Sequence, residues 1–304
     1  MKAEIPAALE GERVDRAIAL LCDVTRARAA ALVAEGAVRL DGAAVAIRSR
    51  RVAAGQALDV DLAGVGGAAP ALAPDPSVGV VVVHEDAAVI VVDKPPGLVV
   101  HPGAGHATGT LAQGLLSRYP ELAGVGEAGR PGIVHRLDVG TSGLLVVART
   151  PQAYASLVRQ LAAHTVDRRY VALVWGTVGA GAGLVDAPIG RSANDPTQMA
   201  VAETGRPART RYEVLARFAA PAPTTLLECR LETGRTHQVR VHLAAIGHPV
   251  VGDARYRGRR RSVPAPRPFL HAHRLAFDHP ARGERSHHHS PLPADLEDVR
   301  ELLA

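Results

Sequence analysis

The chain has 304 residues, 47% of them hydrophobic and 21% charged, a length that suggests about two domains. Its two cysteines, Cys22 and Cys229, are too few for the disulfide framework of a small secreted domain. Charged residues interrupt every apolar run before it is long enough to span a bilayer. The N-terminal stretch carries acidic residues and lacks the apolar core of an export signal. We therefore expect a cytoplasmic protein without membrane contact.

Net charge is +5, and the basic residues are 33 arginines against two lysines, Lys2 and Lys94. Arginine is suited to planar, two-point contacts with phosphates and bases, so a polyanionic partner is one interpretation. An Ala-, Arg- and Gly-rich composition is equally consistent with nucleotide bias in the genome. Charge alone does not decide between the two.

Residues 1–62 are predicted to form a small α/β domain. Apolar spacing predicts helices over 13–21 and 26–35, the second ended by Gly36. Strands are expected over 37–40, 43–47 and 57–62, with a turn at Asp41-Gly42. Residues 63–79 are rich in Gly, Ala and Pro without periodicity, which is typical of a linker.

Residues 80–304 are predicted to form a second, larger domain of the α+β class. The two valine-rich runs 80–83 and 89–92 predict buried strands around a short turn, and 144–148 is another apolar run. A helix is expected over 151–164, with further strands at 170–175, 210–218 and 225–232. Thr236 is the expected N-cap of a helix that Gly247 ends. Strands without regular βαβ spacing favour an α+β sheet domain.

The most informative segment is the Gly-rich loop at residues 131–143, directly before the apolar run 144–148. Such loops, which end in a core strand, are typical places for functional side chains. In an extended loop, Arg136 and Asp138 point to the same side. On their own, the two residues are better explained as a surface ion pair.

Four ordered segments of the larger domain resemble the pseudouridine synthases of the RluA/RluD family. They are Val92-Asp93-Lys94-Pro95-Pro96-Gly97-Leu98-Val99-Val100-His101-Pro102-Gly103, His135-Arg136-Leu137-Asp138 with Thr141-Ser142-Gly143, Arg169-Tyr170-Val171-Ala172-Leu173-Val174-Trp175-Gly176, and Thr233-Gly234-Arg235-Thr236-His237-Gln238-Val239-Arg240-Val241-His242. The resemblance implies that family's catalytic fold, a mixed and mainly antiparallel sheet with flanking helices. It also implies isomerisation of uridine to pseudouridine in RNA, and large-subunit ribosomal RNA is the expected substrate.

The resemblance also implies a role for individual residues. Asp138 matches the catalytic aspartate, which acts in its ionised form as nucleophile or base. Tyr170 matches the tyrosine beside the base, and Arg240 the basic residue paired with the aspartate. Arg136 matches the arginine that fills the gap left by the flipped nucleotide. The neighbouring side chains expected to bind substrate are His135, Arg235 and His237.

Residue positions alone leave these roles open. Tyr170 shares a strand face with Ala172 and Val174, as a core tyrosine would, and Arg240 could cap a nearby carbonyl. After Asp138 the chain has Val139-Gly140, where the family commonly has a basic and an acidic residue. The departure bears on contacts with flanking nucleotides rather than on the chemistry.

The small domain resembles an RNA-binding module first described in a small-subunit ribosomal protein, with two short helices beside a compact hairpin sheet. The matching segments are Gly11-Glu12-Arg13-Val14-Asp15, Thr25-Arg26-Ala27-Arg28 and Glu35-Gly36-Ala37-Val38-Arg39-Leu40-Asp41-Gly42. The arginines expected to face phosphates are Arg26, Arg28, Arg39, Arg48, Arg50 and Arg51. The alternative is an ordinary solvated surface.

Three other functions are alternatives to isomerisation. A glycoside or nucleoside hydrolase needs a second carboxyl group, for which Asp93, Glu203 and Glu232 are available. Serine hydrolysis lacks the Gly-x-Ser-x-Gly turn around Ser142. An inactive RNA-binding relative would retain the basic surface but could lose the catalytic acid.

No cofactor is expected, because the isomerisation is redox-neutral and adds no group. No metal is expected, since the histidines lack the His-Glu-x-x-His spacing. RNA is the expected partner, and the protein is expected to act as a monomer with no obligatory protein partner.

Overall fold

The computed structural model describes residues 1–22, 24, 26–62, 72–103, 106–127, 129–192, 195 and 198–303, without the side chains of residues 26 and 27. Its chain divides into two compact units, Met1–Ala71 and Leu72–Ala304. Residues 63–71 of the expected linker are outside the described ranges. Residues 72–79 pack on the larger unit instead, where Leu72 contacts the core and the Asp75 amide donates to the Gln113 carbonyl at 3.0 Å.

The smaller unit packs two helices on a small antiparallel sheet. Its elements are β1 (Lys2–Glu4), η1 (Ala7–Leu9), α1 (Val14–Leu21), α2 (Arg26–Ala34), β2 (Val38–Leu40), β3 (Ala43–Ala44) and β4 (Ala57–Val60). The described strands pair in the order β1-β4-β2-β3. The buried side chains include Val14, Ile18 and Leu32 from the helices, which contact Leu40 and Leu58 of the sheet. The amphipathic spacing therefore predicted the core of this unit correctly.

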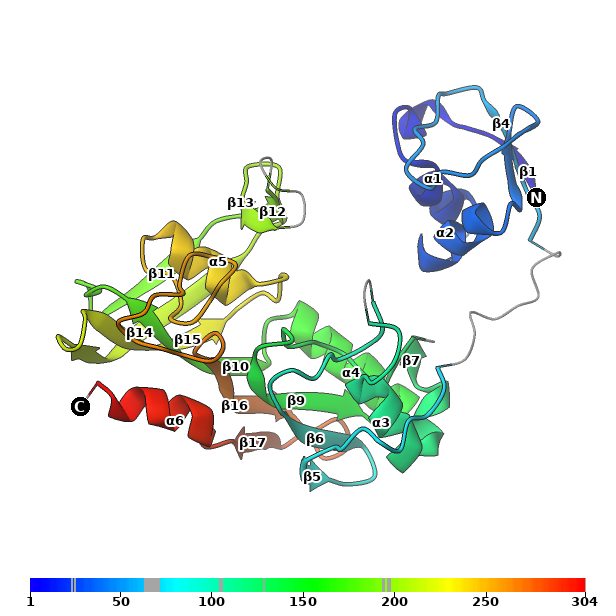
Figure 1. Cartoon of the computed structure of the whole chain (residues 1–304). Helices are drawn as coiled ribbons and strands as arrows, with labels where there is room; N and C mark the ends of the chain where they lie inside the picture. Colours follow the sequence, from blue (N-terminus) through cyan, green and yellow to red (C-terminus); the bar gives the residue numbers. More distant parts are fainter. Residues whose placement is uncertain are drawn as a thin grey trace. The chain divides into compact units, whose positions relative to one another are not determined.

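The larger unit is a mixed, mainly antiparallel sheet flanked by helices, as expected (Figure 1). Its elements are β5 (Val82–Glu85), β6 (Val89–Lys94), α3 (Leu111–Arg118), η2 (Pro120–Gly124), β7 (Gly126–Glu127), β8 (Arg130–Pro131), β9 (Ser142–Ala148), α4 (Pro151–Ala162), β10 (Asp167–Trp175), β11 (Ala182–Asp186), β12 (Ile189–Arg191), β13 (Met199–Val201), β14 (Arg209–Phe218), β15 (Thr224–Leu231), α5 (Gln238–Ala245), β16 (Leu270–Asp278), β17 (Arg285–His289) and α6 (Ala294–Glu301).

Nine of the described strands form one sheet in the order β11-β14-β15-β10-β16-β9-β6-β5, with β17 beside β16. All of its neighbouring strands are antiparallel except β9 and β16, which run parallel at the centre. At that junction Gly143 has φ of +114°, and a Cβ there would lie 2.3 Å from the Ala272 carbonyl oxygen. Only glycine allows the two central backbones to approach this closely.

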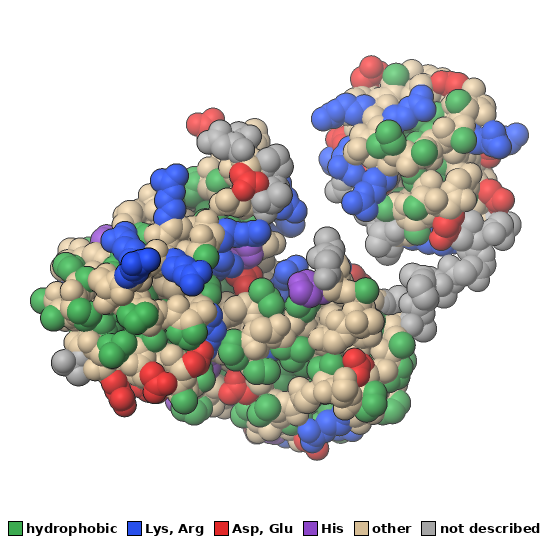
Figure 2. Space-filling view, in the orientation of Figure 1, with side chains coloured by type: hydrophobic (Ala, Val, Ile, Leu, Met, Phe, Trp, Pro, Cys, Tyr) green, Lys and Arg blue, Asp and Glu red, His purple; other side chains and the backbone are tan. Residues whose placement is uncertain are grey.

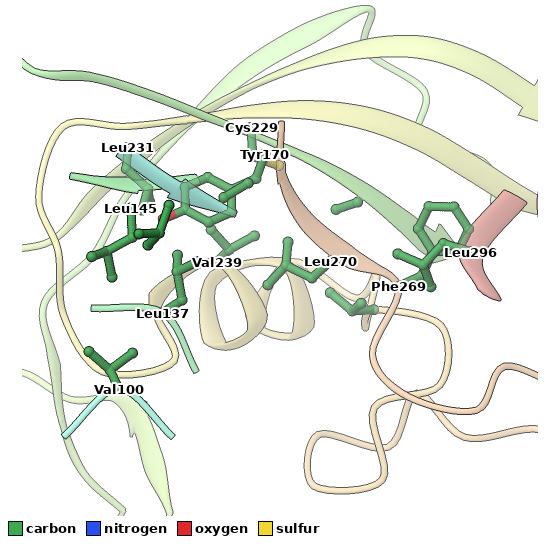
Figure 3. Close-up of a cluster of buried hydrophobic side chains, with 14 of the residues drawn as sticks. Val100, Leu137, Leu145, Tyr170, Cys229, Leu231, Val239, Phe269, Leu270 and Leu296 are labelled. Atoms are coloured by element: carbon green, nitrogen blue, oxygen red, sulfur yellow. The ribbon is translucent and has the colours of Figure 1, made fainter. Parts of the chain in front are cut away.

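The core of the larger unit lies between the sheet and its helices. Tyr170, Leu231, Val239 and Leu145 belong to one cluster of buried side chains, with Leu137 from the Gly-rich loop below them (Figure 3). Figure 1 shows α4 near β9 and α5 beside β14 and β15. Helices α4 and α5 cover different parts of one sheet. The central strand β10 lies between the part covered by α4 and the part covered by α5.

Two expectations for the larger unit need correction. Val80–Val83 were expected to be buried, but β5 is an edge strand, and Val81 just before it and Val83 within it are 58% and 44% exposed. Helix α5 begins at Gln238, and its N-cap is His237 in the left-handed region (φ 57°), not Thr236. The Gln238 side chain already accepts from the Arg235 amide and from the Thr233 hydroxyl, so the loop is closed without Thr236.

Candidate active site

A cavity of about 720 Å³ opens between α4 and the N-terminus of α5, above strand β10. Figure 2 shows basic and histidine side chains gathered around the hollow on this face. Its lining includes all seven residues expected to serve catalysis or substrate binding: His135, Arg136, Asp138, Tyr170, Arg235, His237 and Arg240. Residues separated by about a hundred positions in the chain are thus brought to one place.

Asp138 and Arg240 are directly paired in this cavity. The Arg240 Nη1 donates to Asp138 Oδ2 at 3.1 Å, and the side chains are 9% and 15% exposed. Arg240 also donates through Nε and Nη2 to both oxygens of Asp253, at 2.6 and 2.9 Å. Burial opposes the charge of Arg240, but the hydrogen bonds and charges of Asp253 and Asp138 raise its pKa above the ordinary value. The Arg240 guanidinium is therefore a cation that Asp253 holds in place, and it holds the Asp138 carboxylate in turn.

The loop that carries Asp138 is held at several backbone atoms. The Gly97 amide donates to the Val139 carbonyl at 2.7 Å, and the Thr141 amide donates to the Asp138 carbonyl at 3.0 Å. Fully buried Lys94 donates from Nζ to the carbonyls of Pro95 and Leu98 at 2.8 Å and to that of Val139 at 3.4 Å. Burial lowers the pKa of Lys94 to about 7, assisted by the Arg267 charge and opposed by Asp138.

Arg267 fixes the other end of the loop. It donates to the Gly140 carbonyl at 3.1 Å and to the Ser142 hydroxyl at 3.1 Å, and it forms a two-point ion pair with Asp295 of α6. The Arg- and Pro-rich segment 257–268 thus supplies a structural arginine. A catalytic carboxylate needs such a rigid loop if its distance to the substrate is to be constant.

Tyr170 forms part of the cavity wall and is 5% exposed. Its ring packs among Leu231, Leu145 and Val239 (Figure 3). Burial raises the pKa of Tyr170 to about 12, with a further increase from Asp138 that the charge of Arg168 opposes. At neutral pH the side chain is therefore a protonated phenol that presents a flat apolar face.

The two expected histidines differ in their surroundings. His135 Nε2 accepts a hydrogen bond from the Val146 amide at 3.2 Å, and burial lowers the pKa of this imidazole to about 3. The ring is neutral and ties the loop to β9. His237 Nδ1 shares a hydrogen bond with the Tyr256 hydroxyl at 2.8 Å, and burial also lowers its pKa.

The rim of the cavity is basic. Arg130, Arg136 and Arg206 are exposed and line it, and Arg235 is half-buried with its Nε donating to the Pro207 carbonyl at 3.0 Å. Among the described lining residues, Asp138 is the only acid. A cavity with several cations around one carboxylate favours an anionic substrate such as a nucleic acid.

Sequence reasoning missed several residues that shape the site. Asp253 follows the end of α5, in a loop without periodicity, and its partnership with Arg240 is visible only in three dimensions. Lys94 was included in a family segment, but its role as a donor to loop carbonyls was not foreseen. Arg168 lines the cavity beside Tyr170 and is 7% exposed. An arginine two residues from a buried tyrosine on the same strand was the available signal.

The arginines expected to bind phosphate in the smaller unit have different environments. Arg39, Arg48, Arg50 and Arg51 are exposed, and two of them donate to backbone carbonyls, Arg39 to Gly42 and Arg51 to Gly11. Arg28 is half-buried, with Nη1 3.9 Å from the Glu35 carboxylate. The side chain of Arg26 and the whole of Thr25 lie outside the described residues.

Two other findings limit the possible sites. In the described ranges, no group of three or more His, Cys, Asp or Glu side chains is arranged to hold a metal ion. His242, for example, contacts the Thr210 hydroxyl and the Ala187 carbonyl, each at 2.9 Å. No described helix combines the length and hydropathy that crossing a membrane requires.

The sequence and fold are similar to those of known proteins over most of the chain. A model of the RNA pseudouridylate synthase family matches residues 88–245. A Pseudomonas aeruginosa protein named ribosomal large subunit pseudouridine synthase D is 44% identical over 99% of this chain and 95% of its own. An RNA pseudouridine synthase of Bacillus subtilis is 48% identical over 72% of this chain and 71% of its own. The structure of human RNA pseudouridylate synthase domain containing 1 is 28% identical, with a TM-score of 0.59 over 74% of this chain and 89% of its own.

Proposed function

Because the chain belongs to the RNA pseudouridylate synthase family, we propose that it isomerises uridines of large-subunit ribosomal RNA to pseudouridine with Asp138 as the catalytic carboxylate. The choice of RNA is supported by relatives along nearly the whole chain that are named ribosomal large subunit pseudouridine synthase D, in Pseudomonas aeruginosa and in Nitrosomonas europaea. Which uridines are substrates is a property of the RNA-binding surfaces rather than of the catalytic loop.

The observation that carries this proposal is a single carboxylate in a cationic cavity. Asp138 is held by Arg240, and no second acid lines the cavity among the described residues. Hydrolysis of a glycosidic bond usually requires two carboxyl groups on opposite sides of the sugar. Of the three candidates for a second one, Asp93 accepts from Ser290, Glu232 pairs with Arg209 and Arg211, and Glu203 is exposed away from the lining. The geometry thus favours isomerisation over hydrolysis.

The reaction breaks one bond and forms another on the same two fragments. The N1–C1′ bond of uridine breaks, the uracil turns, its C5 bonds to C1′, and the proton on C5 is lost while N1 gains one. An ionised Asp138 serves each of the three available routes: attack on the ribose carbon, attack on the base, or removal of a ribose proton. Arg240 donates to the carboxylate and orients it, because it is itself fixed by Asp253.

The target nucleotide must leave its stack or pair to reach Asp138. The cavity volume lies within the range of small-ligand sites and accommodates one flipped nucleotide. We assign the exposed rim arginines to phosphates, with Arg136 placed to fill the gap in the RNA. Tyr170 would pack its protonated phenol against the base, and Arg235 and His237 would line the nucleotide from the α5 side. His135 would position the loop.

The smaller unit is proposed to be an RNA-binding module that increases the affinity for RNA through Arg28, Arg39, Arg48, Arg50 and Arg51, together with Arg26. Exposed arginines at this density suit sequence-independent phosphate contacts. We expect the enzyme to act as a monomer in the cytoplasm, where ribosomal RNA is available.

Release of tritium from C5-labelled uridine in large-subunit ribosomal RNA tests the proposal, since C5 loses its hydrogen only when it bonds to C1′. The wild-type protein should release tritium without releasing free uracil. Asp138→Asn should abolish release while retaining RNA binding, and Glu203→Gln, which removes an acid outside the cavity, should behave as wild type. Free uracil as the product, or wild-type activity of Asp138→Asn, would contradict the proposal.

A further inference from the structure

Arg168 is a buried cation with an unsatisfied hydrogen-bonding group. The residue is 7% exposed, and its Nε is buried with no hydrogen-bond partner among the described residues. Burial lowers the pKa of Arg168, although the guanidinium remains charged at any physiological pH. Buried charged groups are normally paired, because unpaired burial forfeits their hydration without compensation.

The other arginines nearby follow that rule. Arg240 pairs with Asp138 and Asp253, and Arg267 pairs with Asp295. Arg169, the next residue of β10, pairs with Asp167 and Glu228. Arg168 has no such acid partner in the described part of the chain. Its missing partner is therefore expected to arrive with the substrate.

The position of Arg168 indicates which part of the substrate is its missing partner. Arg168 lines the cavity and precedes Tyr170 by two positions on β10, so both side chains lie on the same face of the strand. Tyr170 and His135 line the same cavity, and the charge of Arg168 acts on both. A Cβ on Gly234 would lie 2.8 Å from Nη1, so the glycine leaves room for the guanidinium.

RNA phosphates are an unsuitable partner for a group this deep. They remain on the backbone, where exposed Arg130, Arg136 and Arg206 surround the cavity mouth. A flipped uracil, by contrast, enters the cavity and acquires negative charge during the reaction. When the N1–C1′ bond breaks with its electron pair on the base, that charge spreads over N1, O2 and O4.

We propose that Arg168 is a catalytic residue that donates hydrogen bonds to a carbonyl oxygen of the departing uracil and keeps the detached base in the cavity while it turns. The inference rests on the proposed function, and it names the side chain that stabilises the uracil as it leaves the ribose. After rotation, the electron pair left on the base forms the C5–C1′ bond, the proton on C5 passes to water, and N1 takes a proton from water, so the charge on the base disappears and Arg168 releases it. A cation preorganised for charge that develops only in the transition state contributes most to the rate.

The test measures single-turnover consumption of uridine and of 5-fluorouridine at the same site of one RNA. Fluorine withdraws electrons and stabilises the departing anion, so the fluorinated base depends less on Arg168. Arg168→Met should slow uridine consumption by about 100-fold or more, and the loss should be clearly smaller with 5-fluorouridine. Arg168→Lys should recover part of the uridine rate. An equal loss on both bases, or no loss, would overturn the proposal.

Controls separate this outcome from misfolding and from failure of the proposed function. Arg169→Met removes an arginine that projects from the other face of the same strand and should lose no more rate on uridine than on 5-fluorouridine. A melting curve for each variant reports folding. If the wild-type protein forms no pseudouridine, the proposed function is refuted. If it forms pseudouridine but Arg168→Met slows both substrates equally, only the proposed role of Arg168 is refuted.

Discussion

Replacing Lys94 by methionine should remove a pH dependence of stability that this residue imposes on the larger unit. Lys94 is fully buried, and its amine donates to three backbone carbonyls that include the carbonyl next to Asp138. Burial lowers the pKa of Lys94 from 10.5 to about 7. The unfolded chain therefore holds more protons than the folded chain between these pH values, and stability rises with pH in that window.

The magnitude follows from the difference between the two pKa values. Between pH 7 and 8.5, the folded protein loses most of the proton on Lys94 while the unfolded chain keeps it. The free energy of unfolding should then rise by about 1.5 kcal/mol over that interval. Above this range Cys229 acts in the opposite direction, because burial raises the pKa of its thiol to about 12 and the unfolded thiol ionises earlier. The comparison is therefore confined to pH 7–8.5, below the ordinary pKa of the thiol.

Denaturant unfolding followed by tryptophan fluorescence provides the assay. Trp175 is the one tryptophan of the chain and is buried in the larger unit, so its signal reports unfolding of that unit. The difference between wild type and Lys94→Met cancels the contribution of histidines whose protonation ends near pH 7. Wild type should gain stability relative to the variant as pH rises from 7 to 8.5. Parallel pH profiles would refute a depressed pKa for Lys94.

Three further substitutions test the surroundings of the site. Asp253→Asn deprives Arg240 of its two-point partner and should lower the free energy of unfolding by about 2–3 kcal/mol together with the single-turnover rate; unchanged values would make Asp253 dispensable. Arg240→Lys keeps the charge but cannot bind both carboxylates in the same geometry, so tritium release should fall at least about tenfold, whereas full activity would show that charge alone suffices. Replacing Arg48, Arg50 and Arg51 together by glutamine should reduce the slope of log affinity against log salt by about 2 for single-stranded RNA, and an unchanged slope would mean that these side chains contact no phosphate.

Local patterns predicted the elements that depend on neighbouring residues. Apolar spacing identified α1 and α4, because a helix that buries one face repeats apolar residues at the helical period. The continuous apolar runs 89–92 and 144–148 lie in β6 and β9, which are buried on both faces. The same reasoning failed for Val80–Val83, since a run of valines does not show whether its strand will have a neighbour on both sides. Position at the edge of a sheet is a property of the whole topology.

The site was predicted as far as the family segments reached. They identified Asp138, Tyr170 and Arg240, and the structure places these around one cavity. The segments did not identify the supporting partners. Asp253 holds Arg240, and Lys94 holds the loop of Asp138, through contacts that span 13 and 45 positions respectively, while the catalytic roles themselves stay predictions. Pairings over such distances leave no periodic trace in one sequence.

The most direct test of the central claim is a map of pseudouridine in large-subunit ribosomal RNA from cells that lack this gene, complemented with either wild-type protein or Asp138→Asn. The proposed function predicts that specific pseudouridines disappear in the deletion strain, return with the wild-type protein, and stay absent with the variant at equal expression. Identical maps with and without the gene would contradict ribosomal RNA as the substrate, and restoration by Asp138→Asn would contradict the catalytic role of that carboxylate.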